Sequence, residues 1–312
     1  MKIKPNTADA LWMVAGAVIL AIALLVVWHF HQESNPAQQL AFKASRVDVV
    51  SRMQLALATA SEAEKSAVLA TTDEDSQKFA DQARAATAEV ERERLELGKV
   101  LASGGTQRER DLLSQFSEAF GELKRVDDEV LGLAVKNTNI KAYALAFGPA
   151  ADTLAEMSAA LSRVVAKRAN SPDAKRSMSL AFGVEIAALR IQTLLAPHIA
   201  EESDSRMDQM ETSMATEAAE ARKDLDGLAA LPGSKGDADV ATALACFARY
   251  GELEGRIVAL SRENTNVRSL AKSLSQKRKA MTVCLDVLEA LKQAILDEPI
   301  AGVAYGRPPI PR

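Results

Sequence analysis

Two short stretches decide the fold of this chain: KNTNIKAYALAF at Lys136–Phe147 and ENTNVRSLAKSL at Glu263–Leu274. They lie 127 residues apart and share Asn-Thr-Asn and a later alanine; the identical positions are Asn137, Thr138, Asn139 and Ala144 in the first and Asn264, Thr265, Asn266 and Ala271 in the second. The similarity continues outward, since the segment that begins at Ser51 resembles the segment that begins at Ser177. A constant offset indicates an internal repeat, so we expect two related halves, about 36–168 and 174–297.

Each half is predicted to contain two shorter helices and one long helix. The composition is typical of a helical protein, because 48% of the residues are hydrophobic and only 4% are aromatic. Clusters of Gly, Pro, Asp and Ser mark the breaks, and the predicted helices span about 36–71, 74–102, 107–168, 174–197, 202–230 and 238–297. The third and sixth would each be roughly 90 Å long.

Both long helices carry apolar residues at heptad spacing, a pattern that packs helices at the shallow angles of a bundle. With these lengths we expect an all-α fold in which six helices form two stacked four-helix bundles over residues 36–297 and share the two long helices. Gly148–Pro149 predicts a kink in the third helix. The aligned residues of the sixth helix are Ser275–Gln276, so no corresponding kink is expected there.

The segment Leu11–Trp28 carries no charge, and about 18 to 20 such residues span a hydrocarbon core of about 30 Å. Lys2 and Lys4 precede it, which favours a cytoplasmic N-terminus. We therefore expect a cytoplasmic tail at 1–10, a transmembrane helix at 11–30 in the bacterial inner membrane, a periplasmic domain and a short C-terminal tail at 298–312. A cleaved secretory signal is the alternative, and it too would export the rest of the chain.

Composition and motifs exclude several classes of function. A net charge of −4 with interspersed signs gives no electrostatic footprint for nucleic acid. The sequence shows no catalytic constellation, phosphate loop or cluster of metal-binding side chains, so we expect neither an enzyme nor a cofactor. Cys246 and Cys284 fall on one predicted helix, too far apart to form a disulfide if that helix is continuous.

The repeated Asn-Thr-Asn stretches, the duplicated segments such as Ser51–Ala70 and the N-terminal apolar segment resemble the helical bimodular sensor domain of bacterial chemoreceptors and sensor kinases. More broadly, residues 36–297 resemble the four-helix-bundle sensor domain of methyl-accepting chemotaxis proteins. The resemblance implies signal transduction in chemotaxis, a small organic acid or a periplasmic partner protein as the ligand, and a homodimer. Family members usually continue through a second membrane helix into a cytoplasmic signalling region.

The sequence ends at Arg312 without that second helix. We therefore expect the chain to act through a partner in trans, which would be a receptor, a kinase or a periplasmic binding protein.

Arginines are the candidate ligand-binding residues. Arg278 lies on the predicted core seam of the sixth helix, where a guanidinium is costly unless a carboxylate pairs with it. Arg46 and Arg52 are expected to face it, and Arg163 and Arg190 are the corresponding candidates in the other bundle. Internal salt bridges and solvated surface charge are the competing interpretations.

Asn137 and Asn264 also lie on the predicted core seams, and together with Thr138, Asn139, Thr265 and Asn266 they would form a polar layer at the junction. The leading interpretation is that their amides bind free backbone groups of the Thr71–Asp75 and Pro197–Ser203 turns or fix helix register. A ligand role stays open for them.

Two hypotheses for the function follow. The first is a membrane-anchored periplasmic sensor or ligand-binding protein, and the second is a membrane-tethered assembly scaffold without a small-molecule ligand.

Overall fold

The computed structural model describes residues 16–25 and 36–300, and within these ranges the chain is all-helical, with no strand. This confirms the predicted fold class. A helix at Gly16–Leu25 is followed by α2 (Pro36–Leu69), α3 (Asp73–Gly104), α4 (Gln107–Ala134), α5 (Thr138–Leu145), α6 (Ala151–Lys167), α7 (Ala174–Ala200), α8 (Asp204–Ala229), α9 (Ala238–Glu263), α10 (Thr265–Lys272) and α11 (Arg278–Asp297). Two π-helical turns, η1 (Ala146–Ala150) and η2 (Ser273–Lys277), join α5 to α6 and α10 to α11.

Local side-chain chemistry fixes where these helices start. Thr106 and Glu109 form a capping box at the start of α4, because each side chain accepts a hydrogen bond from the other residue's backbone N–H. Asp237 caps α9 by accepting from the N–H of Asp239. The turn before α9 contains Gly233 and Gly236 at φ 77° and 80°, a conformation that glycine adopts without steric penalty.

The chain divides into two compact units, and the division cuts through several helices. The first unit comprises Met1–Ala58, Thr87–Gly121 and Thr282–Arg312, and the second comprises Thr59–Ala86 and Glu122–Met281. Each unit has its own buried apolar side chains.

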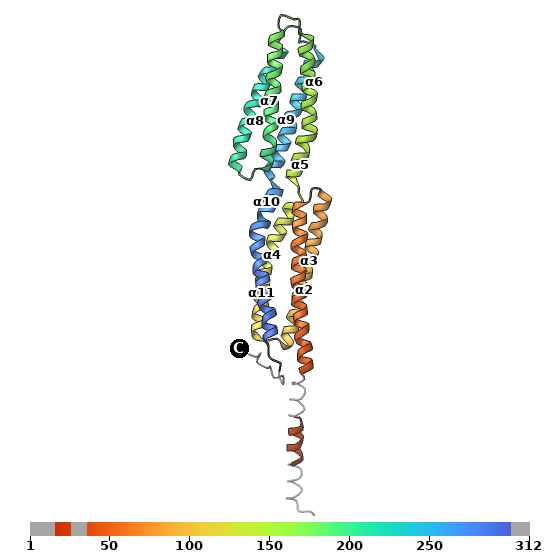
Figure 1. Ribbon diagram of the computed structural model, residues 1–312, viewed down its shortest axis with the longest axis vertical. Coiled ribbons are helices and arrows are strands. Elements are labelled where there is room, and N and C mark those ends of the chain that lie inside the picture. Colours follow the sequence, from red (N-terminus) through yellow and green to blue (C-terminus); the bar gives the residue numbers. More distant parts are fainter. Residues whose placement is uncertain (1–15, 26–35, 301–312) are drawn as a thin grey trace, which may run out of the picture. The chain divides into compact units, whose positions relative to one another are not determined.

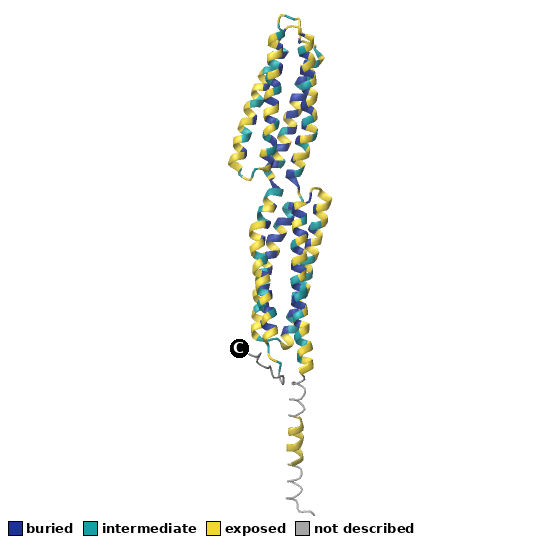
Figure 2. Cartoon of the chain, in the orientation of Figure 1, coloured by how far each residue is buried: buried dark blue, intermediate teal, exposed yellow. Residues whose placement is uncertain are grey.

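In the first unit, segments of α2, α3, α4 and α11 run side by side (Figure 1) and bury one face each (Figure 2). The Phe116 and Phe120 rings of α4 stack with their centroids 5.5 Å apart. Further fully buried side chains come from the other three helices: Val50, Met53, Val90, Leu97, Cys284, Leu288 and Leu291.

In the second unit, α6, α7, α8 and α9 lie side by side (Figure 1) around one continuous hydrophobic core. Met157, Ile191, Leu225 and Tyr250 contribute to it from the four helices, one from each. A smaller cluster joins α2, α3 and α4 in the same unit, and it is mostly alanine: Ala63, Ala67, Ala80, Ala83 and Leu131. The small side chains let these helices approach closely.

The prediction of two continuous long helices is wrong. Asn137 and Asn264 each adopt the left-handed conformation at φ 52° and ψ 37°, which ends α4 before α5 and α9 before α10. Asparagine tolerates this conformation better than most residues because its short amide can hydrogen-bond locally. As a result, Cys246 and Cys284 lie on separate helices, where both are buried free thiols.

A π-turn also forms in the sixth predicted helix, where the residues aligned with Gly148–Pro149 are Ser275–Gln276 and include no proline. The turns η1 and η2 occupy equivalent positions, 127 residues apart, although η1 contains a proline and η2 does not. A π-turn adds one residue to a helical turn and rotates everything after it. The buried face after the break at Asn264 runs through Thr265, Ser269, Ser273 and Lys277, and the first two of these residues precede η2.

The helix α7 is, by length and composition, the one described helix apolar enough to cross a membrane, and a third of its most apolar window is buried. The helix Gly16–Leu25 is shorter and apolar, and its large apolar side chains are exposed. The predicted anchor at 11–30 falls partly outside the described residues, which in this region are 16–25.

Candidate ligand-binding site

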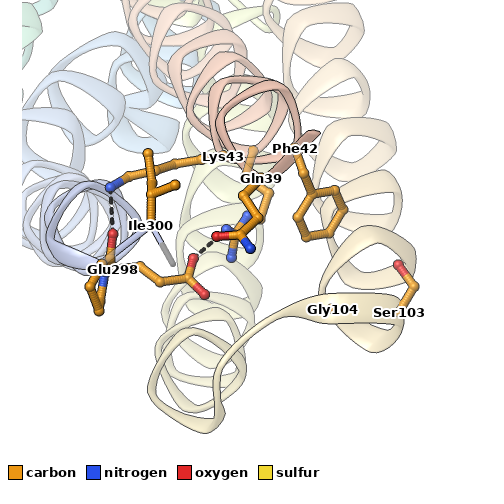
Figure 3. Close-up of a pocket in the computed structure, with 9 residues that line it drawn as sticks. Gln39, Phe42, Lys43, Ser103, Gly104, Glu298 and Ile300 are labelled. Atoms are coloured by element: carbon orange, nitrogen blue, oxygen red, sulfur yellow. Dashed lines mark hydrogen bonds and ion pairs between the residues drawn. The ribbon is translucent and has the colours of Figure 1, made fainter. Parts of the chain in front are cut away.

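The first unit contains an open pocket of about 700 Å³, a volume within the range of small-molecule sites (Figure 3). Helix α2 contributes Gln39, Phe42, Lys43 and Arg46, the end of α3 contributes Ser103 and Gly104, and the segment after α11 contributes Glu298, Pro299 and Ile300. Arg46 is the unusual member of this set, because it lines the pocket while only 2% of its surface is exposed.

The Arg46 guanidinium has two carboxylate partners of different character. Its Nη1 donates to both carboxylate oxygens of Glu109, at 2.8 and 2.7 Å, and the Glu109 side chain is fully buried. Its Nη2 donates to Glu298, whose side chain is 29% exposed. The third donor, Nε, is buried and meets no acceptor among the described residues. Thus the inner carboxylate is enclosed, and the outer one borders solvent.

The capping box at the start of α4 holds the inner carboxylate in place. Glu109 Oε2 accepts the backbone N–H of Thr106 at 3.0 Å as well as the hydrogen bond from Arg46. Sequence reasoning missed Glu109, although the pattern Thr-x-x-Glu at a helix start was a usable signal.

An aromatic wall completes the inner part of the pocket. The Arg46 guanidinium carbon lies 4.7 Å from the centroid of the Phe42 ring, within the range of a cation–π contact. Gly104 makes this placement possible, because a Cβ there would lie 3.0 Å from the Phe42 ring. Lys43 Nζ donates to the backbone oxygens of Leu296 and Glu298, so it binds the C-terminal end of α11.

The structure separates the other predicted arginines from this pocket. Arg52 is 42% exposed and pairs with Glu93, which raises the pKa of its guanidinium. In the second unit, exposed Arg163 pairs with Asp239 and exposed Arg190 with Glu217. The interpretation of these three as salt-bridged surface charge fits their exposure.

The expected place of Arg278 on the core seam is wrong, because Arg278 is exposed and Lys277 occupies the buried position. The break at Asn264 and the π-turn η2 together interrupt the continuous helical register on which the predicted position of Arg278 depends. Lys277 Nζ lies 2.7 Å from Glu64 Oε2 and 2.8 Å from Asp127 Oδ1. Burial of this group of three raises the pKa of Asp127, although the ammonium of Lys277 opposes the shift.

The predicted polar layer forms in the second unit, and its two halves pair reciprocally. The hydroxyl oxygens of Thr138 and Thr265 lie 3.1 Å apart, and each accepts the backbone N–H of the other residue at 3.2 Å. Asn139 and Asn266 repeat the pattern, because the side-chain oxygen of each accepts the other's N–H at 3.1 to 3.2 Å.

The remaining amides of the layer bind the neighbouring turns, as the sequence predicts. Asn137 Nδ2 donates to the backbone oxygen of Thr72 at 3.4 Å, and Asn264 Nδ2 donates to that of Glu201 at 2.7 Å. Asn137 also donates to Asp73, whose pKa is lowered mainly by Lys141 and further by this amide. With its hydrogen bonds made inside the protein, the layer serves to hold the helix breaks in register.

A buried histidine lies just beyond the predicted helix 174–197, because α7 continues to Ala200. His198 lies in the last turn of α7, is fully buried, and contacts Ser261 Oγ at 2.8 Å and Glu211 Oε1 at 2.9 Å. Arg262, and to a lesser extent His198, lowers the pKa of Glu211. No local sequence pattern predicts the contacts among His198, Glu211 and Ser261, because these residues come from three different helices, α7, α8 and α9.

No protein-family model matches this chain, and no curated protein shows significant sequence similarity to it. A function for this chain therefore has to be argued from the chemistry of its own residues.

Proposed function

We propose that this chain is a membrane-anchored sensory protein whose helical domain binds a small organic acid at Arg46. One observation carries the proposal: a guanidinium only 2% exposed lines a pocket of about 700 Å³, and the side chain of its outer carboxylate partner is 29% exposed. A planar guanidinium with paired donors matches the two oxygens of a carboxylate.

The charges around the pocket favour an anion. Arg46 and Lys43 supply two positive charges, while Glu109 and Glu298 supply two negative ones. Glu109 is enclosed, so the charge that an incoming carboxylate would replace is that of Glu298. A neutral or cationic ligand that displaced Glu298 would leave Arg46 with Glu109 alone and would not replace the negative charge at Nη2, which is unfavourable in a mostly buried place.

The finer architecture belongs to the same proposal. Residues 36–297 would form two stacked four-helix bundles, and residues 11–30 would anchor them in the bacterial inner membrane with the N-terminus in the cytoplasm and the domain in the periplasm. The exposed apolar side chains on Gly16–Leu25 support an anchor, because such a surface needs a hydrophobic cover: Val18, Ile19, Leu20, Ile22, Leu24 and Leu25. The resemblance to chemotaxis sensor domains supports a sensory role and a protein partner that receives the signal.

Calorimetric titration of the whole 312-residue chain in detergent with acetate, succinate, malate and citrate tests the proposal. We expect saturable binding of at least one acid, lost in Arg46→Lys, which keeps the charge but not the planar donors. Arg52→Lys is the matched control on the same helix and should bind as the wild type does. Absence of binding by all four acids, or equal binding by Arg46→Lys, would refute the proposal.

A second candidate is a self-associating scaffold, and a stripe on α7 favours it. Met178, Phe182, Ile186 and Leu189 are 45% to 58% exposed and lie about one helical turn apart. Sedimentation of Phe182→Asp and Leu55→Asp would test this candidate, because both residues are large, apolar and exposed but Leu55 lies on α2 and outside the stripe. A dimer lost only in Phe182→Asp supports the scaffold, and a monomeric wild type refutes it.

A further inference from the structure

We propose that Glu298 is a built-in competitor: its carboxylate occupies the Arg46 site from within the chain, and a ligand enters by displacing it. The inference rests on the proposed function and adds a mechanism by which the site is regulated. It starts from a difference in burial between the two carboxylates that bind Arg46, since Glu109 is fully buried and Glu298 is partly exposed.

Only the outer carboxylate is free to exchange. Glu109 is fully buried, belongs to the capping box of α4 and also accepts the N–H of Thr106. Glu298 is the first residue after α11 and its side chain borders solvent. Its backbone oxygen accepts from Lys43 at 2.8 Å, a contact visible in Figure 3. Release of Glu298 therefore breaks one ion pair and loosens one partly buried hydrogen bond, and it leaves the helix bundle intact.

The guanidinium geometry gives a ligand an advantage over Glu298. In arginine, Nε and Nη2 point to the same side and form a fork that matches the two oxygens of one carboxylate. Glu298 engages only Nη2, and the buried Nε has no acceptor among the described residues. A ligand carboxylate placed on the fork would satisfy both donors, so it would make one more charge-assisted hydrogen bond than Glu298 makes.

Self-occupation weakens the apparent affinity for a ligand. If the open form is about 1–10% of the population, the apparent dissociation constant is raised by about 10- to 100-fold. Removal of the Glu298 carboxylate would remove this competition. Binding would also release Glu298 from Arg46, so occupancy of the pocket would change the contacts of the chain just after the end of α11.

A labelling experiment tests the competitor without a known ligand. Gln39→Cys places a thiol at the pocket, and the native cysteines Cys246 and Cys284 are buried. The probes are an anionic and a cationic methanethiosulfonate, sulfonatoethyl and trimethylammonioethyl, and the measured quantity is the ratio of their labelling rates. This ratio should rise by about tenfold in Glu298→Ala, and it should stay within about twofold in Asp297→Ala, which removes a neighbouring exposed charge. An unchanged ratio in Glu298→Ala would overturn the inference.

Citrate titration of the same variants separates this inference from the proposed function. Citrate binding that tightens by about 10- to 100-fold in Glu298→Ala supports both. Binding that depends on Arg46 but is the same in wild type and Glu298→Ala overturns the competitor and keeps the proposed function. A raised labelling ratio without binding of any of the four acids supports the occlusion by Glu298 and overturns the organic-acid site.

Discussion

Lys277→Met removes the positive charge from a buried group of three ionisable side chains, and we expect a large loss of stability. Lys277, Glu64 and Asp127 are 3%, 0% and 4% exposed, and the ammonium lies 2.7 and 2.8 Å from the two carboxylates. Without Lys277, two like charges stay buried and unpaired. Breaking a buried pair in this way costs about 3–5 kcal/mol. Thermal unfolding followed by circular dichroism of the whole chain should show a midpoint lower by roughly 6–20 °C.

The matched control is Lys279→Met, which removes an exposed lysine two residues away and should change stability by less than about 0.5 kcal/mol. The triple substitution Lys277→Met, Glu64→Gln and Asp127→Asn should recover most of the loss, since it leaves no buried charge. If Lys277→Met behaves like Lys279→Met, or if the triple variant is no more stable than the single one, then the three groups do not stabilise the fold as a charged unit.

Three further predictions follow from particular residues. The raised pKa of Asp127 means that the folded state holds a proton more tightly than the unfolded state, whose carboxyl titrates near 3.8. The stability of wild type relative to Asp127→Asn should therefore fall as pH rises from 3.8 through the raised pKa, and then level off. A stability difference that is independent of pH in melting experiments would contradict this prediction. Asn264→Gly keeps access to the left-handed backbone but loses the hydrogen bond to Glu201, whereas Asn264→Ala loses both. Chemical denaturation should therefore find Asn264→Gly less stable than wild type and more stable than Asn264→Ala. The reverse order of the two variants would contradict this prediction. Pro149→Ala should change stability by less than about 1 kcal/mol and leave η1 intact in a crystal structure, since η2 forms without a proline; straightening of the helix would contradict it.

The sequence predicted the features that turns and helical periodicity encode. The helix starts near Asp73, Gln107, Ala174 and Ala238 lie within about four residues of their predicted positions, because capping residues and glycines mark them. The binding of turn backbones by Asn137 and Asn264 also followed from sequence, since a polar residue on an apolar seam needs a partner.

The features that depend on a single extra residue or on distant contacts were beyond sequence reasoning. A heptad count assumes an unbroken helix, so it could not account for the break at Asn264 or for η2, and it selected Arg278 in place of Lys277. Glu298 was missed because its partner Arg46 lies 252 residues earlier in the chain. Arg46 itself was among the predicted arginines, but nothing local distinguished it from Arg52, which lies less than two helical turns away on the same helix.

The most direct test of the central claim is the side-chain Nε–H signal of Arg46 in an NMR titration of the whole chain with citrate. The signal is assigned by its loss in Arg46→Lys. We predict a saturable shift of this signal, since the buried Nε gains an acceptor when the ligand carboxylate replaces Glu298. A signal that stays unchanged through citrate saturation, in wild type and in Glu298→Ala alike, would contradict the assignment of Arg46 as the binding residue.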